Sequence, residues 1–346
     1  MDGTSAAVPT RVVVADERAR GRWSRRIAWV VTGLSVLVAL SSLAANARYF
    51  QRDARLAESW HALSRTAPAK VAVVDVAGAI LGGEGFAMRQ IEQVRRDDAV
   101  KAIVLRVDSP GGTVSGADEI HERLRRVVAD RDIPVVVSMG SIAASGGYYV
   151  AMANAGRDDV IFAEPATLTG SIGVIIPHFD VSRLLERFDV ADDSITSGPL
   201  KEMLSPTKAR TPELADRERA VLQALVDDMF ARFKDIVRAG RPKLDEAALD
   251  RVATGQVFTA QQALAAGLVD RIGFLDDAID RAVELAGLTA QTARVVRYAR
   301  PRSLVEELLG AGVPTARGPL EAFADLTTPR VWALASWWPA LVASHR

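Results

Sequence analysis

The sequence predicts an α/β fold with a mainly parallel sheet. The prediction rests on the alternation of short apolar, β-branched segments with segments that carry apolar residues at helical spacing. The chain shows no internal repeat, which favours one main module over a duplicated one. The expected strands lie near 71–76, 100–107, 133–138 and 159–163, and the expected helices near 84–96, 115–130 and 147–155.

The C-terminal half is expected to contain a long helix from 212 to 239. Its apolar residues recur at helical spacing: Leu214, Val221, Leu225, Met229, Phe233 and Ile236. Two shorter helices, near 259–266 and 275–286, and a strand near 293–298 complete the expected elements.

The segment 27–45 carries no charge, and as a helix it would be about 28 Å long, close to the apolar thickness of a bilayer. Arginines are more numerous before it than after it, which favours a cytoplasmic N-terminus. We therefore predict one transmembrane helix that anchors the chain in the cell (inner) membrane, with its bulk on the extracytoplasmic side. A cleaved signal peptide is the alternative, because Ala45-Asn46-Ala47 resembles a cleavage site.

This anchor divides the chain into five predicted regions. A cytoplasmic tail covers 1–26, a stalk follows the anchor at 46–69, and the main domain covers 70–290. The C-terminal extension, 291–346, ends in an apolar segment that suits a membrane interface or a packed helix equally well. That segment holds Trp332, Trp337 and Trp338.

The composition excludes several classes of function. Lys plus Arg and Asp plus Glu number 43 each, so the chain as a whole presents no positive field to attract nucleic acid. The sequence has no cysteine, which excludes disulfides, thiolate metal sites and a cysteine nucleophile. We expect neither a metal nor a cofactor.

The run Met-Gly-Ser-Ile-Ala-Ala-Ser-Gly-Gly-Tyr-Tyr at 139–149 places Ser145 between a buried strand and a helix. Small residues around Ser145 permit a tight turn. A serine at such a junction projects into a cleft, close to the N-terminal amides of the helix. Ser145 is therefore the candidate nucleophile, against the alternative of an ordinary turn rich in small residues.

A serine nucleophile needs a base, and none of the four histidines has a recognisable catalytic context. His61 falls in the predicted stalk, His121 in a charged helix, and His345 next to the chain end. His178, in a loop, is the one nearest the motifs. We expect all of them at the surface, so a Ser-His-Asp triad is poorly supported.

Lysine can replace histidine as a base when its ammonium is desolvated or flanked by positive charge. Lys201 ends the turn-prone run Ser-Gly-Pro-Leu-Lys at 197–201 and is the candidate. Taken alone, a lysine in such a loop is more often a solvated surface charge.

Two glycine-containing segments could complete a site. The consecutive Gly111 and Gly112 follow a predicted strand, and their amides could turn toward a ligand oxygen, as an oxyanion hole requires. Ser171, between glycines at 168–174, could reach a catalytic amine. Each segment alone could also be a simple turn.

Together these segments resemble bacterial signal peptide peptidase A, of the shorter single-domain type. The resemblance covers about residues 70–290. It is carried by Asp-Ser-Pro-Gly-Gly at 108–112, Ala-Ala-Ser-Gly-Gly-Tyr-Tyr at 143–149, Leu-Thr-Gly-Ser-Ile-Gly-Val at 168–174, Ser-Gly-x-x-Lys at 197–201 and Leu-Ser-Pro-Thr at 204–207. Glu202 departs from this pattern, because the family commonly has aspartate after the dyad lysine.

The resemblance implies a crotonase-like fold, a repeated ββα superhelix related to the caseinolytic protease. It also implies a Ser/Lys dyad of Ser145 as nucleophile and Lys201 as general base, with Ser171 orienting the lysine and the Gly111 and Gly112 amides as the oxyanion hole. The implied substrates are remnant signal peptides and other short apolar or unfolded peptides. The implied assembly is a ring-like homo-oligomer whose sites are shared by adjacent subunits.

Two other functions remain open. A crotonase-like fold can host acyl-CoA chemistry, although the predicted extracytoplasmic location and the Ser/Lys pair speak against it. A catalytically silent membrane scaffold that binds peptides is the second alternative, and the intact motifs speak against it.

Overall fold

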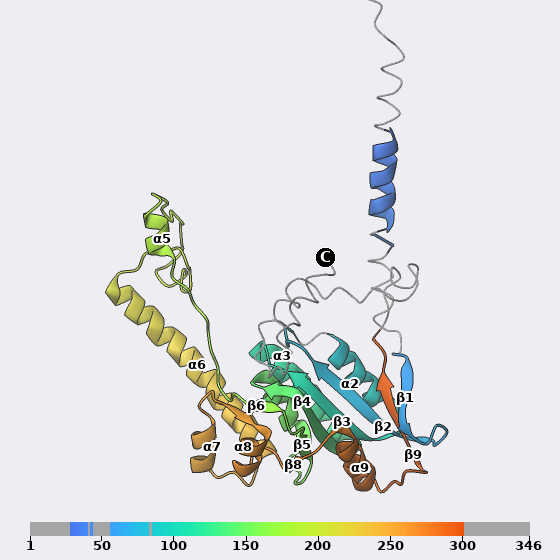
Figure 1. Ribbon diagram of the computed structural model, residues 1–346. Helices are drawn as coiled ribbons and strands as arrows, with labels where there is room; N and C mark the ends of the chain where they lie inside the picture. The colour runs from blue at the N-terminus through green and yellow to red at the C-terminus, as the bar shows by residue number, and fades with distance from the viewer. Residues whose placement is uncertain (1–27, 41, 44–55, 83–84, 301–346) are drawn as a thin grey trace, which may run out of the picture. The chain divides into compact units, whose positions relative to one another are not determined.

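The computed structural model describes residues 28–40, 42–43, 56–82 and 85–300 (Figure 1). Residues 28–40 and 42–43 are helical and belong to one compact unit, and a second unit begins at Leu56. No helix in the described ranges combines the length and the apolarity needed to cross a membrane. The rest of the predicted anchor, the tail 1–26, the stalk residues 46–55 and the C-terminal segment 301–346 lie outside the described residues.

Within the described residues, nine strands form one sheet in the order β1-β9-β2-β3-β4-β5-β8, with β6 paired to β4 and β7 to β6. All pairings are parallel except β1 with β9 and β6 with β7, which confirms the predicted α/β class with a mainly parallel sheet. The strands are β1 (Glu58–Leu63), β2 (Ala69–Ala77), β3 (Val100–Ser109), β4 (Val135–Ala144), β5 (Ile161–Ala163), β6 (Leu168–Gly170), β7 (Val257–Thr259), β8 (Arg271–Ile272) and β9 (Ala293–Tyr298).

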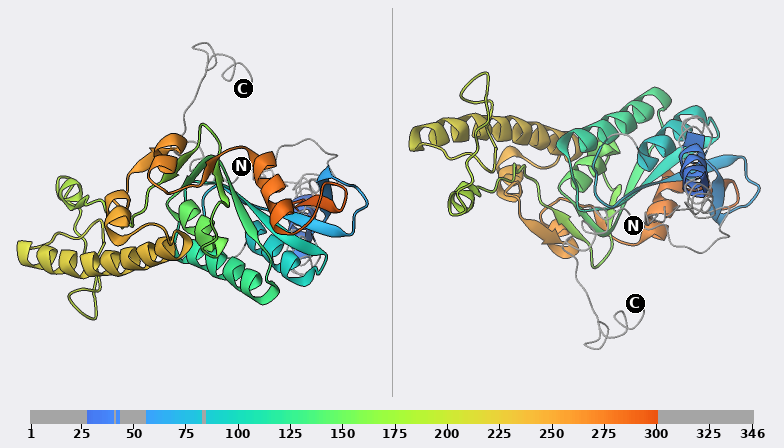
Figure 2. Two further views of the ribbon diagram at one scale, coloured as in Figure 1. Left: turned by 90° about the horizontal axis from the view of Figure 1, so that it is seen from below. Right: turned by 90° about the horizontal axis from the view of Figure 1, so that it is seen from above.

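Helices cover both faces of this sheet, with α2 and α3 on one face and α9 on the other (Figure 2). The central strands are therefore buried on both sides and read as continuous Val/Ile/Leu runs, as in β4, where Val135, Val136 and Val137 are fully buried. The helices are α2 (Phe86–Arg96), α3 (Val114–Arg131), α4 (Gly146–Ala151), α5 (Ser182–Glu186), α6 (Pro212–Gly240), α7 (Glu246–Val252), α8 (Ala260–Ala265) and α9 (Leu275–Leu285), with a 3-10 turn at Met152–Asn154.

Each strand and helix expected from the sequence is present. The largest difference in bounds is at β4, which was expected to end at 138 and continues to Ala144. Its small residues read as a turn, but Ile142, Ala143 and Ala144 pair with β6 and extend the strand to the position before Ser145.

The sheet reaches beyond the predicted main domain at both ends. Part of the predicted stalk is strand β1, which pairs antiparallel with β9, so His61 lies in the sheet. The sequence of β1 does not alternate between apolar and polar residues, because β1 is an edge strand with one neighbour in the sheet. Its residue Trp60 is half exposed, and the guanidinium of Arg65 lies 4.2 Å from the centre of the ring.

The long helix α6 begins with Thr211 as N-cap and Pro212 in its first turn and extends about 44 Å. Phe233 and Val237, near its C-terminal end, are buried in the core. Residues 174–211, here called the arm, leave the sheet after β6 and extend to the opposite end of α6, where α5 lies (Figure 1).

Candidate active site

Ser145 stands between β4 and α4, as predicted. Its backbone has φ 53° and ψ −120°, a conformation that non-glycine residues rarely adopt. Two hydrogen bonds hold it there: Ser145 N–H donates to the Gly170 carbonyl at 2.9 Å, and its own carbonyl accepts from Tyr149 N–H at 2.9 Å. A strained backbone retained by its surroundings is typical of functional residues.

The Gly-Gly segment after β3 lies directly against this turn. A Cβ added to Gly111 would lie 2.5 Å from the Gly146 nitrogen and 3.0 Å from the Ser145 Cβ. Gly112 is bridged to Ile80, whose N–H donates to the Gly111 carbonyl and whose carbonyl accepts from Thr113 N–H. The structure therefore brings the two predicted motifs into contact.

Ser109 fixes the shape of this segment, a role the sequence analysis did not assign to it. Its side chain is fully buried; the hydroxyl donates to the Gly78 carbonyl at 2.7 Å and accepts from Gly111 N–H at 3.1 Å. The Gly111 amide is thus already engaged within the chain. The Ser-Pro-Gly-Gly motif contained the signal, because a serine two residues before a glycine can bond its amide.

Two other amides next to Ser145 are free of acceptors among the described residues, those of Gly112 and Gly146. The two residues lie close together, because a Cβ added to Gly146 would lie 3.3 Å from the Gly112 nitrogen. Gly146 N–H is also the first amide of α4, which has no partner within the helix. Paired donors beside a serine can hold a negatively charged oxygen.

Ser171 follows the strand that supports Ser145. Gly170, the last residue of β6, accepts the Ser145 amide, and Ser171 N–H donates to the Gln256 carbonyl at 2.7 Å. The backbone of Ser171 has φ 52°, also in the left-handed region. Three of the four predicted segments, those of Gly111–Gly112, Ser145 and Ser171, therefore converge at one place.

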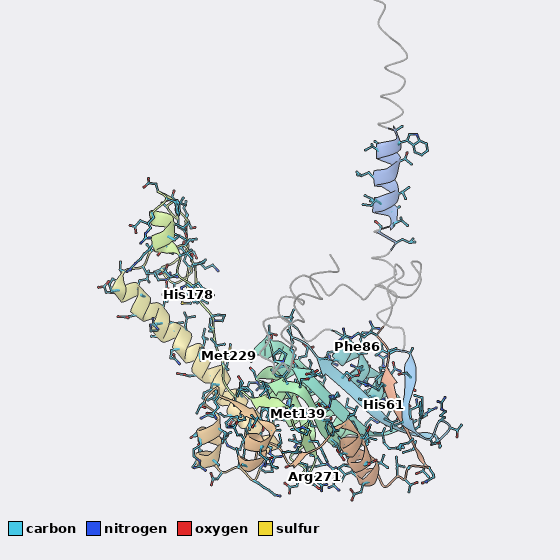
Figure 3. All side chains as sticks on the ribbon, viewed as in Figure 1. His61, Phe86, Met139, His178, Met229 and Arg271 are labelled. Atoms are coloured by element: carbon cyan, nitrogen blue, oxygen red, sulfur yellow. The ribbon has the colours of Figure 1, made fainter. Side chains whose placement is uncertain are left out.

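Lys201 does not join them within the chain. It is exposed and lies in the arm, whose side-chain hydrogen bonds, among the described residues, all stay within 180–218. In Figure 3 the labelled His178 lies on the arm, whereas Met139 lies in the sheet, on the strand that leads to Ser145.

The arm also presents an unusual number of apolar side chains to solvent. Ile195 is completely exposed, and Phe179 is 79% exposed. Others that are more than half exposed are Ile175, Leu184, Phe188 and Val190.

The prediction that all histidines lie at the surface was wrong for His121. It is buried between α3 and α4, where its ring meets the ring of Tyr149 edge to face at 5.5 Å. Burial lowers its pKa, against the opposing effect of the Asp118 carboxylate. The prediction failed because His121 lies on the side of α3 that packs against α4, although α3 is rich in charged residues. His178 is exposed on the arm, and His345 lies outside the described residues.

A polar network ties α4 to α3 and α6. Tyr149 Oη donates to Asp118 Oδ1 at 2.5 Å, and Arg232 of α6 donates to the same carboxylate at 2.7 and 2.9 Å. Burial and the bond to Asp118 raise the pKa of Tyr149 well above its usual range, so the phenol stays protonated. No group of His, Asp and Glu side chains within the described residues has an arrangement that would hold a metal ion.

Comparisons with known proteins agree with this geometry. Residues 128–289, which include α4 and the arm, match peptidase family S49. A putative protease of Synechocystis sp. is 40% identical over 241 residues, covering 70% of this chain and 83% of that protein.

Two further relatives are longer than the region they share with this chain. A putative signal peptide peptidase of Enterococcus faecium is 38% identical over 61% of this chain and 58% of that protein. Protease 4 of Salmonella typhi is 39% identical over 63% of this chain and 35% of its own length. The serine turn, the paired amides beside it and these matches lead to one conclusion: the chain belongs to peptidase family S49 and is a serine peptidase.

Proposed function

We propose that this chain is an endopeptidase that cleaves peptides through an acyl-enzyme on Ser145. The observation that carries the proposal is the convergence of the strained Ser145 with the free amides of Gly112 and Gly146. Lys201 is the proposed general base, and Ser171 is proposed to orient it. We also propose that the fold is crotonase-like, because in that fold backbone amides in the loop after a strand hold an oxygen of the substrate.

In the proposed reaction the neutral Lys201 amine takes the Ser145 proton as the Oγ attacks the peptide carbonyl carbon. The Gly112 and Gly146 amides donate to the oxygen that becomes negative. The C–N bond then breaks, and the lysine ammonium gives its proton to the leaving amine. Water, deprotonated by the same lysine, hydrolyses the ester and regenerates Ser145. The Gly111 N–H donates to the Ser109 hydroxyl and is not proposed as an oxyanion donor. Because glycine has no side chain, Gly111 allows its segment to pack closely against the serine turn.

We infer that each site is completed by a second copy of the chain. Within one chain Lys201 lies on the arm, which has no hydrogen bond to the serine turn among the described residues, so we propose that the arm of a neighbour completes the dyad. The exposed apolar residues of the arm support this inference, because many exposed apolar side chains in one segment are commonly covered by a partner. A ring-like homo-oligomer with shared sites satisfies both requirements.

The proposed substrates are remnant signal peptides and other short apolar or unfolded peptides. The support is the name of the Enterococcus faecium relative, a putative signal peptide peptidase. A membrane location suits such substrates, and the apolar segment 27–45 is proposed as the anchor, with the catalytic domain on the extracytoplasmic side.

The test uses the full chain in detergent with a fluorogenic apolar peptide. Ser145→Ala and Lys201→Ala are each expected to abolish hydrolysis while folding and assembly stay unchanged. Full activity in Lys201→Ala would exclude the dyad. Loss in the serine variant alone would direct attention to His178 as the base.

Co-assembling the two inactive variants tests the shared site. Some sites would then combine an intact serine with an intact lysine, and part of the activity should return. If mixed assemblies, verified by mass, remain inactive, each site is built from one chain.

A further inference from the structure

The guanidinium of Arg210 lies at the junction between the arm and α6 and is almost completely buried. Its side chain is 8% exposed, and that of its partner Glu218, on α6, is 6% exposed. Arg210 Nε donates to Glu218 Oε2 at 2.5 Å. Buried arginine is rare unless it is paired, and here the pairing leaves its two terminal nitrogens for other acceptors.

Both terminal nitrogens of Arg210 bind backbone carbonyls of the segment that follows Lys201. Nη2 donates to the Ser205 carbonyl at 2.9 Å and, at 3.5 Å, to that of Glu202, and Nη1 donates to the Lys208 carbonyl at 2.9 Å. Glu202, one of these carbonyl residues, directly follows Lys201 in the chain. One side chain therefore joins three carbonyls of the lysine-bearing segment to the first turns of α6.

The segment between these carbonyls is held in a conformation it would not adopt alone. Leu204 has φ 65°, in the left-handed region that favours glycine. A leucine stays there when its surroundings determine its conformation. The Arg210 contacts to Glu202 and Ser205 lie on either side of Leu204 and supply that constraint.

A second set of contacts braces the same segment from the other branch of the arm. Val181 N–H donates to the Pro206 carbonyl at 2.8 Å, and Thr207 Oγ1 donates to Asp192 Oδ2 at 2.6 Å. Hydrogen bonds from the hydroxyls of Ser194 and Thr207 lower the pKa of Asp192 to about 2, so it remains an acceptor at neutral pH. These contacts close the arm on itself, but none of them reaches α6.

We propose that Arg210 is a positioning residue for Lys201. Arg210 fixes the lysine-bearing segment relative to α6. It thereby sets the position of the Lys201 amine relative to that helix. The inference rests on the proposed function, in which Lys201 is the base. The role requires arginine, because its planar fork reaches Glu218 and the carbonyls at once, whereas a lysine ammonium is a single point charge.

The chain contains a matched control for a buried arginine, Arg241. It pairs with Asp270 at 2.7 Å, with side-chain exposures of 10% and 13%, and its Nε donates to the Gly267 carbonyl at 2.8 Å. Arg241 has the same kind of contacts as Arg210, but they lie at the C-terminal end of α6 and do not involve the arm.

The experiment compares Arg210→Lys with Arg241→Lys in the full-length assembled enzyme. Both variants keep the positive charge, and both should lower the melting temperature. Only Arg210→Lys should lower kcat, by about 10²-fold for a displacement near 1 Å, with KM unchanged.

A double variant separates positioning from stability. Arg210→Met with Glu218→Met removes both buried charges, which often leaves stability unchanged. The double variant should melt close to the parent enzyme and still show the reduced kcat.

Three outcomes are informative. A parental kcat in Arg210→Lys, or in the double variant, overturns the positioning role while Lys201→Ala remains inactive. Equal losses of kcat in Arg210→Lys and Arg241→Lys also overturn it, because the effect would then be one of general stability. An active Lys201→Ala would instead refute the proposed function itself, and the role of Arg210 with it.

Discussion

The two parts of the proposed site differ in how the chain holds them. The serine turn is embedded in the sheet: Ser109, two residues before Gly111, is completely buried, and Ser145 is bonded to both β6 and α4. Among the described residues, the side-chain hydrogen bonds of the lysine-bearing arm reach no further than the first turns of α6, and the arm exposes Ile195 completely. The nucleophile and the proposed oxyanion donors are thus preorganised by the core, while the base depends on the arm.

This difference separates two properties that usually change together. Damage to the serine turn should affect chemistry and folding in every chain, whether it is assembled or not. Damage to the arm should affect assembly and base delivery and leave the stability of the sheet domain intact.

The largest effect is expected for Gly112→Ala. The added Cβ would lie 1.9 Å from the Ile80 carbonyl oxygen and 2.6 Å from its carbon, both backbone atoms. The bridge to Ile80 must open, which displaces the Gly112 amide, and losing one oxyanion donor costs about 10²- to 10³-fold in kcat. Steady-state kinetics on assembled enzyme measure this loss.

Gly82→Ala is the control for that substitution, because no other atom of the described residues lies within 4 Å of its added Cβ. It should retain parental kcat. If Gly112→Ala also retains parental kcat, the Gly112 amide takes no part in the reaction.

The arm side of the contrast is tested by Phe179→Ser. Burying a phenylalanine side chain against a partner stabilises the assembly by about 1.5–3 kcal/mol, so its loss should raise the dissociation constant of the oligomer. The melting temperature of the isolated domain should not change. Sedimentation velocity over a concentration series measures the first effect and calorimetry the second.

Phe274→Ser provides the comparison, because Phe274 is 57% exposed and lies outside the arm, before α9. It should leave assembly unchanged. Equal dissociation constants for the parent and Phe179→Ser would mean that the arm surface at Phe179 does not bind another copy.

A smaller effect is expected for Ser109→Ala. The substitution leaves the Gly78 carbonyl and the Gly111 N–H without their partner in a buried place, which costs about 1–3 kcal/mol of unfolding free energy. The kcat should fall less than in Gly112→Ala, because Gly112 keeps its bridge to Ile80. Denaturant unfolding measures the loss of unfolding free energy, and steady-state kinetics measure the change in kcat.

Ser138→Ala is a matched buried serine, since its hydroxyl accepts from Arg106 and does not touch the glycine segment. It should lower stability without a comparable fall in kcat. The same kcat in both serine variants would remove Ser109 from the support of the oxyanion segment.

Sequence patterns predicted the core well and the edges poorly. Val135–Val137 and the other central strands are buried on both faces, and burial of that kind leaves an unbroken apolar run in the sequence. Strand β1 escaped because it has a single neighbour, so Glu58 and Trp60 show no pattern. The three-residue strands β6 and β7 are too short to show a period.

The candidate site divides in the same way. Ser145, Gly112 and Ser171 could be proposed because glycine and serine at strand ends have a local conformational reason to be there. Ser109 was missed as a support of Gly111, and His121 was misplaced, because both depend on what packs against them. No local pattern reports that Arg210 is buried with Glu218, since the two are brought together by the start of α6.

The smallest expected effect is a change in the stability of the sheet domain with pH, caused by His121. Burial lowers the pKa of His121 in the folded protein, and although Asp118 and Glu122 oppose this, burial has the larger influence. Below an unfolded pKa of about 6.5 the unfolded chain binds a proton that the folded chain does not, so stability should fall with acid by less than about 1 kcal/mol at pH 6. Replacing His121 by glutamine, which does not titrate, should flatten the dependence of unfolding free energy on pH in this window. An unchanged slope in His121→Gln would show that His121 accepts a proton in the folded state, and that the packing around Tyr149 admits more water than its burial implies.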